Sequence, residues 1–365
     1  MASELNPIQQ RIKQSPPIDI TKPCSDSWVK GRHILITGGV GGFGAGFAAR
    51  WAAAGASIVV GDINAQKGEA FVRDLREELG SPNIHFVHCN VTEWDSQAAF
   101  FKEALKLSPH GGIDAVVANA GIAKADDLAN PHELSTDEPQ RPDLAVTDVN
   151  LYGVLYTVHL AMFYLPRNPG SVPSSPDRDP NNTTRDRHIL LVGSMASLAP
   201  IAIQPQYGAA KHGVLGLFRS LRSTTFTHGV RINMICPYFV ETSILSRPAR
   251  LLLAGTGLGQ VGDVVEAATR LTADASICGR ALCIGPPAKS VRDENGVLIP
   301  AVGEDAGGAD GPETGIWECY AEDFELVEAW TRRWVAIFSY IEAAKGWAGW
   351  GKDILRAVFG GWMSR

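Results

Sequence analysis

The stretch Thr37-Gly38-Gly39-Val40-Gly41-Gly42-Phe43-Gly44 decides the fold class of this chain. It follows a short β-branched run, His33–Thr37, and leads into a helical run, Ala45–Ala54. Glycine in such a turn lets backbone N–H groups approach a pyrophosphate at the positive end of a helix, because a Cβ would collide with the ligand or the neighbouring strand. The spacing differs from the Gly-x-Gly-x-x-Gly form, so a tight structural turn remains the alternative. The residues expected to contact a dinucleotide here are Gly38, Gly42, Phe43 and Gly44.

Beyond this turn, short β-branched runs alternate with helical stretches. That alternation predicts a mostly parallel sheet with right-handed crossovers. Most of the runs are apolar on both pleat faces, as in strands buried beneath two layers of helices. We therefore predict an α/β fold, a Rossmann-type doubly wound parallel sheet of about seven strands with helices on both faces, plus a C-terminal helical extension. The predicted strands are His33–Thr37, Ser57–Gly61, Ile84–His88, Ala115–Ala118, Ile189–Gly193, Arg231–Cys236 and Ala281–Ile284.

Local composition divides the chain into four parts. Residues 1–30 hold four prolines among polar residues and predict an extended arm. Residues 31–286 form the predicted Rossmann-type catalytic domain, within which 166–187 is rich in Pro, Asp, Asn, Ser and Arg and predicts a solvated insertion or disordered loop. Residues 287–315, rich in Gly, Pro and Asp, predict a linker. Residues 316–365 predict the helical extension.

Tryptophan gathers in that extension, with six of the nine between Trp317 and Trp362. Apolar residues at helical spacing predict two amphipathic helices there. We expect them to pack on the body or on another subunit. An interfacial membrane helix is the alternative, but such helices carry a strongly basic face, and acidic residues dilute the Lys and Arg here. The apolar positions are Phe324, Val327, Trp334, Phe338, Ile341, Trp350, Ile354 and Val358.

The overall charge and the cysteine spacing limit the class of protein. A formal net charge of -6 argues against a nucleic-acid partner, since such proteins show a basic footprint. The six Cys are dispersed along a long chain, which favours reduced thiols over a disulfide framework. Residues 1–14 are polar, unlike a signal peptide. The longest apolar stretch, Gly153–Leu165, is too short to span a bilayer. We expect a soluble, cytoplasmic protein.

No metal site is predicted. His85 and His88 are three residues apart on a predicted strand, so their side chains point to opposite faces of the sheet. Cys278 and Cys283 have no second Cys pair or nearby His and are interpreted as structural thiols.

Asp62, at the end of the second predicted strand, points to NAD as the cofactor. An acidic residue about 20 positions after the glycines can accept hydrogen bonds from the adenosine ribose hydroxyls, and it repels a 2′-phosphate. No Arg follows it directly, and Lys67, a helical turn away, is expected to be solvent-exposed. Capping of the next helix is the structural alternative for Asp62.

The catalytic motifs lie further along the chain. Tyr207-Gly208-Ala209-Ala210-Lys211 is a Tyr-x-x-x-Lys pattern, and Ser194 lies thirteen residues before it. Asn119-Ala120-Gly121 closes the fourth predicted strand, and Asn150 lies in the following helical segment. With the glycine turn, these motifs in this order resemble the short-chain dehydrogenase/reductase family. The resemblance covers about residues 31–286.

The chemistry of the pair can be derived without the family. Tyr207 and Lys211, four residues apart on a helix, share one face. A phenol has an ordinary pKa near 10 and is a poor base at neutral pH. A nearby ammonium and a positive nicotinamide favour the phenolate and lower that pKa, which makes Tyr207 a general acid/base. Ser194 is expected to hydrogen-bond the same substrate oxygen.

The resemblance implies further roles. In the family's pattern, Lys211 also holds the nicotinamide ribose and Asn150 anchors a water that passes protons from Lys211 to solvent. Hydride moves directly between substrate and nicotinamide.

Tyr238 stands where Gly is usual after the Pro and adds bulk beside the nicotinamide. Asn90 replaces the commoner Asp, but its amide carbonyl can still accept a hydrogen bond from adenine. The remaining cofactor contacts implied are Val91, Asn119, Ala120, Gly121, Pro237, Val240 and Thr242.

The substrate is predicted from loop composition. The segment after Thr242 is leucine-rich, from Ile244 to Leu258, and we expect it to lie over the substrate. Ala199–Ile203 adds apolar wall near Tyr207. No Arg or Lys cluster suggests a phosphate or coenzyme A. We expect a small hydrophobic or aromatic secondary alcohol, oxidised with NAD, and a homo-oligomeric enzyme. A non-redox NAD-binding scaffold, or a family member recruited to isomerisation or cyclisation, is the alternative.

Overall fold

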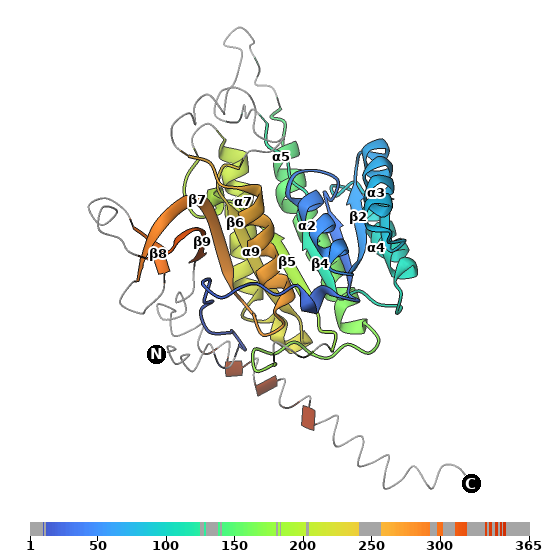
Figure 1. Ribbon diagram of the computed structural model, residues 1–365. Coiled ribbons are helices and arrows are strands. Elements are labelled where there is room, and N and C mark those ends of the chain that lie inside the picture. Colours follow the sequence, from blue (N-terminus) through green and yellow to red (C-terminus); the bar gives the residue numbers. More distant parts are fainter. Residues whose placement is uncertain are drawn as a thin grey trace.

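A nine-stranded sheet organises the computed structural model within its described residues. Seven strands are parallel in the order β3-β2-β1-β4-β5-β6-β7, and β8 and β9 each pair antiparallel with β7. Figure 1 shows β7, β8 and β9 at one edge of the molecule. The described residues are 10, 12–124, 128, 138, 141–179, 182, 184–201, 204–240, 257–292, 298–301, 311–319, 333, 336, 337, 340, 341, 344, 346 and 347. The strands are β1 His33–Thr37, β2 Ser57–Asp62, β3 Ile84–His88, β4 Ala115–Ala118, β5 His188–Val192, β6 Arg231–Pro237, β7 Ala281–Arg292, β8 Leu298–Pro300 and β9 Glu313–Cys319.

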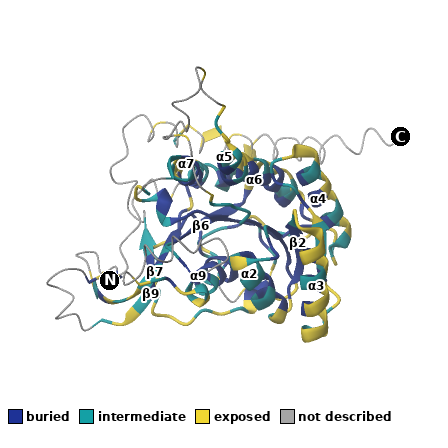
Figure 2. Cartoon of the chain, turned by 90° about the horizontal axis from the view of Figure 1, so that it is seen from above, coloured by how far each residue is buried: buried dark blue, intermediate teal, exposed yellow. Residues whose placement is uncertain are grey.

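Helices cover both faces of the sheet (Figure 2). One layer holds α2, α3 and α9, and the other holds α4, α6 and α7. The described helices are α2 Gly42–Ala53, α3 Ala65–Leu79, α4 Trp94–Leu107, α5 Ala145–Thr147, α6 Gly153–Tyr164, α7 Pro205–Leu221 and α9 Val261–Ala273. Short 3₁₀ turns are η1 Ser27–Val29, η3 Leu165–Arg167, η4 Met195–Ser197 and η5 Thr225–His228, and η2 Asp148–Tyr152 is a π-helix between α5 and α6. The predicted Rossmann-type doubly wound fold is confirmed.

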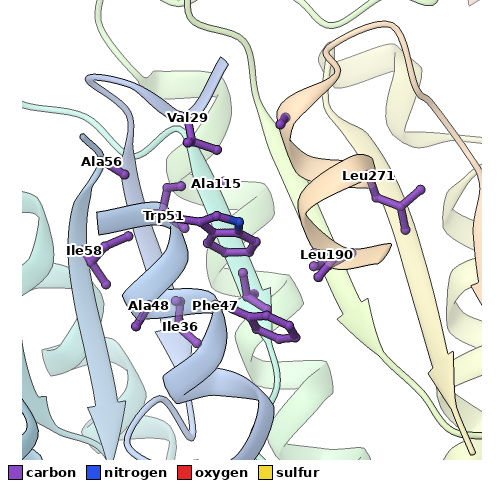
Figure 3. Close-up of a cluster of buried hydrophobic side chains, with 14 of the residues drawn as sticks. Val29, Ile36, Phe47, Ala48, Trp51, Ala56, Ile58, Ala115, Leu190 and Leu271 are labelled. Atoms are coloured by element: carbon purple, nitrogen blue, oxygen red, sulfur yellow. The ribbon is translucent and has the colours of Figure 1, made fainter. Parts of the chain in front are cut away.

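The aromatic core between α2 and α9 fixes one helical layer (Figure 3). The rings of Phe47 and Trp51 stack with centroids 5.4 Å apart. The indole N–H of Trp51 donates to Thr269 Oγ1 at 2.9 Å, so the one polar atom of a fully buried side chain is satisfied. Burying a large aromatic side chain stabilises a fold by about 1.5–3 kcal/mol. This packing supports the start of α2, where the glycine turn lies.

The order of the strands places the site. The chain passes from β1 to β2 on one side and later returns to β4 on the other side of β1. Ligands of open parallel sheets bind at such a reversal, outside the carboxyl ends of the strands. The glycine turn follows β1, and Asn119 follows β4, so both lie at this crevice.

The structure differs from the linker predicted at 287–315. β7 continues through it to Arg292, β8 lies inside it, and β9 begins at Glu313. Its Gly and Pro content misled the prediction. Pro286 and Pro287 fall where the β7–β9 register shifts, between Ile284 and Ala288. A bulge tolerates proline, which cannot donate to the ladder. The predicted C-terminal amphipathic helices lie mostly outside the described residues, although residues such as Ile337 and Tyr340 are helical and exposed.

Described residues near both ends of the predicted insertion, 166–187, are anchored to the body. Its described residues include Asn168, which donates to the carbonyl oxygen of Ile113 at 2.8 Å. Asp186 forms an ion pair with Arg231 at 2.7 Å, and both side chains are 0% exposed. Polar composition suggested solvation, but these polar groups find partners inside the protein, which is what allows them to be buried.

Candidate active site

A cavity of about 290 Å³ lies at the crevice between β1 and β4. The glycine turn and α7 both contribute to its lining. The sequence-predicted residues that line it are Gly38, Gly42, Phe43, Asp62, Asn119, Gly121, Tyr207 and Lys211. It is also lined by residues that the sequence analysis did not assign, which are Val40, Gly41, Asn64, Lys67, Ile122, Val192 and Gly193.

The glycine turn serves both the protein and a ligand. Gly38 has φ +62°, and a Cβ there would meet Ala120 Cα at 2.7 Å. A Cβ on Gly44 would lie 2.4 Å from the carbonyl oxygen of Gly38. Gly42, with φ +51°, faces open space instead. The tight-turn interpretation therefore explains Gly38 and Gly44, while Gly42 leaves room beside the cavity at the first residue of α2.

Asn119 closes the turn from the side of β4. Its amide Nδ2 donates to the carbonyl oxygens of Thr37 at 3.0 Å and Gly38 at 2.8 Å. The backbone N–H groups of Asn119 and Ala120 both donate to Thr37 Oγ1, at 3.2 and 3.3 Å. The polar groups of β1 and β4 are thus mutually satisfied, and the ends of the two strands are held at a fixed separation.

Of the residues predicted to contact the adenosine, only some line the cavity. Asp62 lines the cavity, and its Oδ1 accepts from the backbone N–H of Asn64 at 3.0 Å. Asn90 is committed locally, because its Oδ1 accepts from the N–H of Thr92 at 3.2 Å and from the Thr92 hydroxyl at 2.9 Å. Val91 is buried. Neither Asn90 nor Val91 lines the cavity.

Tyr207, Lys211 and Ser194 come together from two elements. Tyr207 and Lys211 lie one turn apart on α7, and Lys211 Nζ is 5.8 Å from the centroid of the Tyr207 ring. Ser194 is the N-cap of η4, two residues after the end of β5, and its side chain lies close enough to the Tyr207 phenol to favour the phenolate. The phenol is thereby placed between a hydroxyl and the ammonium-bearing side chain, at the edge of the cavity.

Burial governs the protonation of this group. Desolvation raises the pKa of the Tyr207 phenol, and the hydrogen bond with Ser194 only partly opposes that rise. The same desolvation lowers the pKa of Lys211 to about 8. The sequence analysis expected the ammonium and a positive nicotinamide together to lower the Tyr207 pKa, and this stays a prediction. Among the groups of the protein itself, removal from water has the largest influence on that pKa.

Asn150 lies in the π-helix η2 and is fully buried. Its Oδ1 accepts from the backbone N–H of Ile122, and its Nδ2 donates to the carbonyl oxygen of Ile122, both at 2.8 Å. These two bonds fasten η2 to the segment after β4. A Cβ on Gly121 would lie 3.2 Å from Asn150 Oδ1 and 3.8 Å from Lys211 Nζ, so Asn150 lies behind the cavity wall, near the lysine.

The loop after β6 borders the other side of Ser194. Ser194 Oγ lies 3.5 Å from the carbonyl oxygen of Pro237. Val240 is buried and forms an isolated parallel bridge with Gly259, just before α9. Thr242 and most of the leucine-rich segment lie outside the described residues. The rings of Tyr238 and Phe239 pack edge to face, with centroids 4.9 Å apart.

Two sets of residues escaped the sequence analysis. Val192 ends β5 and accepts a hydrogen bond from Lys211, and Gly193 follows it; their position at a strand's carboxyl end was the available signal. Gln97 has no local signal. It is fully buried in α4 and donates to the carbonyl oxygens of Val91 at 2.7 Å and Gly153 at 2.8 Å. It ties the loop after β3 to the helix that follows η2.

Comparison with known proteins identifies the family. The sequence model described as short chain dehydrogenase matches residues 32–250. The 5'-hydroxyaverantin dehydrogenase of Dothistroma septosporum is 33% identical over 273 residues, covering 71% of this chain and 85% of that protein. The chain belongs to the short-chain dehydrogenase family.

Other members add detail. The NADP-dependent dehydrogenase M3 of a Phoma species is 32% identical over 265 residues, covering 70% of this chain and 75% of that protein. The crystal structure of levodione reductase matches with a TM-score of 0.57 and 23% identity over 70% of this chain and 96% of that one, which supports the fold. Short-chain dehydrogenases are oxidoreductases that bind a nicotinamide dinucleotide.

Within the described ranges, no group of three or more His, Cys, Asp or Glu side chains could hold a metal ion. None of the helices described here is long and apolar enough to cross a bilayer. All six cysteines are free.

Proposed function

We propose that this chain interconverts a hydrophobic or aromatic secondary alcohol and its ketone with NAD. Tyr207 is the general acid/base of that reaction. The observation that carries the proposal is the contact of Tyr207 with Ser194, beside the buried Lys211, in the cavity that also holds the glycine turn. NAD, when bound, supplies the hydride acceptor or donor.

Tyr207 takes the hydroxyl proton of the alcohol during oxidation and returns it during reduction. Ser194 donates to the substrate oxygen and stabilises the charge that develops on it. The phenol is a weak base in the free protein, since burial raises its pKa. A cationic ring in the same cavity favours the phenolate, which makes the binding of oxidised cofactor the step that activates the base.

Lys211 and Asn150 support the proton transfer. The Lys211 side chain would hold the nicotinamide ribose. Its ammonium is a donor only, so Lys211 would take up the proton that Tyr207 loses only as it releases one of its own toward solvent. Asn150 belongs to the route by which Lys211 exchanges that proton with solvent. Because both side-chain groups of Asn150 are bonded to Ile122, its backbone is the part that can hold a water.

NAD preference rests on Asp62. The fit of a dinucleotide is supported by Gly42, which leaves open space at the start of α2, and by the carboxylate of Asp62 in the same cavity. That carboxylate accepts from the ribose hydroxyls and repels a 2′-phosphate. Phe43, Ala120, Pro237 and Val240 are proposed to flank the cofactor. Asn90, Val91 and Thr242 remain proposed contacts for its adenine and carboxamide ends.

The substrate class rests on the aromatic side chains that directly follow Pro237, whose carbonyl oxygen lies 3.5 Å from Ser194 Oγ. Tyr238 and Phe239 supply an aromatic pair directly after β6. One relative is named 5'-hydroxyaverantin dehydrogenase, and that name describes the oxidation of a hydroxyl compound. Together these support oxidation of an alcohol whose surroundings are aromatic or aliphatic rather than charged.

The test compares the wild type with Tyr207→Phe, following NADH absorbance across a panel of hydrophobic secondary alcohols at alkaline pH. Loss of general acid/base catalysis costs about 10²–10⁴-fold in kcat. The matched control is Tyr340→Phe, which removes an exposed phenol. Tight NADH binding without turnover on the whole panel would instead support a non-redox scaffold or an isomerising member of the family.

A cytoplasmic homo-oligomer completes the proposal. The free cysteines favour a reducing compartment. Large apolar side chains are exposed on or near α4 and α6, namely Trp94 at 42%, Tyr152 at 51%, Leu155 at 36% and Phe163 at 49%. Such a patch marks a protein contact. Light scattering of the wild type and of Leu155→Asp checks it, because a monomeric wild type contradicts this part of the proposal.

A further inference from the structure

Lys67 reaches across the nucleotide cavity. It lies in the first turn of α3, where its backbone N–H donates to the Asn64 side chain at 2.9 Å. Its side chain extends to the glycine turn, since a Cβ on Gly41 would lie 3.0 Å from Lys67 Nζ. Lys67, Asp62 and Gly41 line the same cavity. The expectation that Lys67 merely points to solvent accounts for its exposure but not for this position.

The position is electrostatically unfavourable without an anion. Lys67 lies at the positive end of α3, and its ammonium comes near Gly41, the N-cap of α2. A cation at a helix N-terminus is destabilising, and two such ends meet here. None of the ion pairs among the described residues involves Lys67. The ammonium is thus a charge in the cavity that a phosphate can neutralise.

We propose that Lys67 is the binding group for an adenosine 2′-phosphate, so that this site accepts NADP as well as NAD. The inference rests on the proposed dinucleotide site. Asp62 takes the ribose hydroxyls of NAD, and a phosphate on that ribose would meet the Lys67 ammonium on the side of the glycine turn. Gly41 has no side chain, which leaves that space to the ammonium and the phosphate. The charge of Lys67 offsets the repulsion from Asp62.

The charge of the 2′-phosphate determines how much Lys67 should contribute to its binding. A 2′-phosphate carries up to two negative charges and three acceptor oxygens, and a charge-assisted contact with an ammonium is stronger than a neutral hydrogen bond. Lys67 is exposed, so solvent screening reduces its contribution. We therefore expect about a tenfold effect on phosphate binding and a steep dependence on salt.

The experiment measures binding without turnover. Dissociation constants of NADH, NADPH, 5′-AMP and adenosine 2′,5′-bisphosphate are determined by calorimetry for the wild type, Lys67→Gln and Lys67→Arg. Lys67→Gln should weaken NADPH and the bisphosphate by about tenfold. It should change NADH and 5′-AMP less than about twofold, since those ligands lack the 2′-phosphate. Lys67→Arg should keep most of the phosphate affinity.

The control is Arg73→Gln, which removes one positive charge from the exposed face of α3, where Arg73 pairs with Asp74. It should leave all four constants unchanged. Equal weakening of NADH and NADPH in Lys67→Gln would overturn the inference, as would a wild type that binds NADH but neither 2′-phosphorylated ligand. Failure to bind either dinucleotide would instead overturn the proposed function.

Discussion

Lys211 Nζ donates a hydrogen bond to the carbonyl oxygen of Val192 at 3.0 Å. Val192 is the last residue of β5, and Lys211 is 4% exposed, so the end of a central strand holds the ammonium in place. Within the part of the chain that the structure describes, this bond uses one of the three ammonium protons. Lys211 also lines the cavity, where Tyr207 and the proposed ribose position lie.

This buried lysine should cost the free protein stability. Burial lowers the Lys211 pKa from 10.5 to about 8, so below pH 8 the folded chain carries a charge that the unfolded chain would solvate better. Lys211→Met should therefore raise the free energy of unfolding near pH 7 by on the order of 1–3 kcal/mol. As pH rises from 8 to 10.5 the folded lysine loses its proton before the unfolded one, and the advantage of Lys211→Met should shrink. Urea unfolding of the wild type and of Lys211→Met across this pH range measures the difference in stability. The turnover of Lys211→Met should fall sharply. Equal stability of both proteins at every pH would contradict the burial argument.

Binding of oxidised cofactor should lower the pKa of Tyr207. In the free protein burial raises that pKa, whereas a positive ring in the cavity favours the phenolate. Spectrophotometric titration of phenolate, with and without NAD⁺, should show one tyrosine that ionises at lower pH in the complex. The signal should be missing from Tyr207→Phe. An unchanged titration curve on adding NAD⁺ would count against Tyr207 as the activated base.

Gly44→Ala should disrupt the turn more than other glycine substitutions. The added Cβ would lie 2.4 Å from the carbonyl oxygen of Gly38 and 2.6 Å from Asn119 Nδ2, so β1 and β4 must shift. We expect a loss of about 1–3 kcal/mol of stability and weaker NADH binding. Gly216→Ala on α7 is the control, because its Cβ meets nothing within 4 Å and alanine favours a helix. Thermal unfolding and NADH titration compare the two, and equal effects would show that the turn tolerates a side chain.

Acid should weaken the fold through His33. Its ring nitrogens lie 2.9 Å from Ser57 Oγ and 2.8 Å from the carbonyl oxygen of Ala104, and burial lowers its pKa to about 4. The unfolded chain binds this proton near pH 6.5 and the folded chain only near pH 4. Stability is therefore complete above pH 6.5 and falls toward pH 4, by on the order of 1–3 kcal/mol. Urea unfolding at pH 7.5 and pH 5 should show a smaller loss for His33→Gln than for the wild type. His88→Gln, at an exposed position, should behave as the wild type does.

Glu318 should hold β9 and the N-terminal arm to the sheet. It pairs with Arg280 at 3.2 Å, with side-chain exposures of 2% and 0%, and accepts from the N–H of Ile18 at 2.6 Å. Removing one partner of a buried pair costs about 3–5 kcal/mol. Glu318→Ala should lower stability by about that amount. Glu313→Ala, on the exposed end of the same strand, should have little effect. Chemical denaturation decides, and a loss below about 1 kcal/mol for Glu318→Ala would contradict the assigned role.

The parallel part of the fold was predictable because its strands are continuous apolar runs. Ile34–Ile36 and Ile189–Leu191 are completely buried, and such continuous apolar runs are typical of strands between two helical layers. The site was predictable for a related reason. Gly38, Asp62 and Tyr207 follow strands or begin a helix beside them, and parallel strands bring their carboxyl ends to one edge.

The features that the sequence did not predict depend on contacts between residues that lie far apart in the chain. Nothing near Asp186 signals that it will be buried against Arg231, and nothing near Gln97 signals its two carbonyl partners. The antiparallel strands were hidden by Pro286 and Pro287, which occupy a bulge. The burial that raises the Tyr207 pKa in the protein alone depends on packing, which the spacing of a motif does not report.

Because β9 pairs along most of β7, the open side of the parallel sheet is already occupied by the chain itself. A shortened version ending near residue 286 would remove this cover and expose a ladder of unsatisfied amides, a known route to aggregation. Protein engineers who want a minimal catalyst should therefore retain the chain through Cys319.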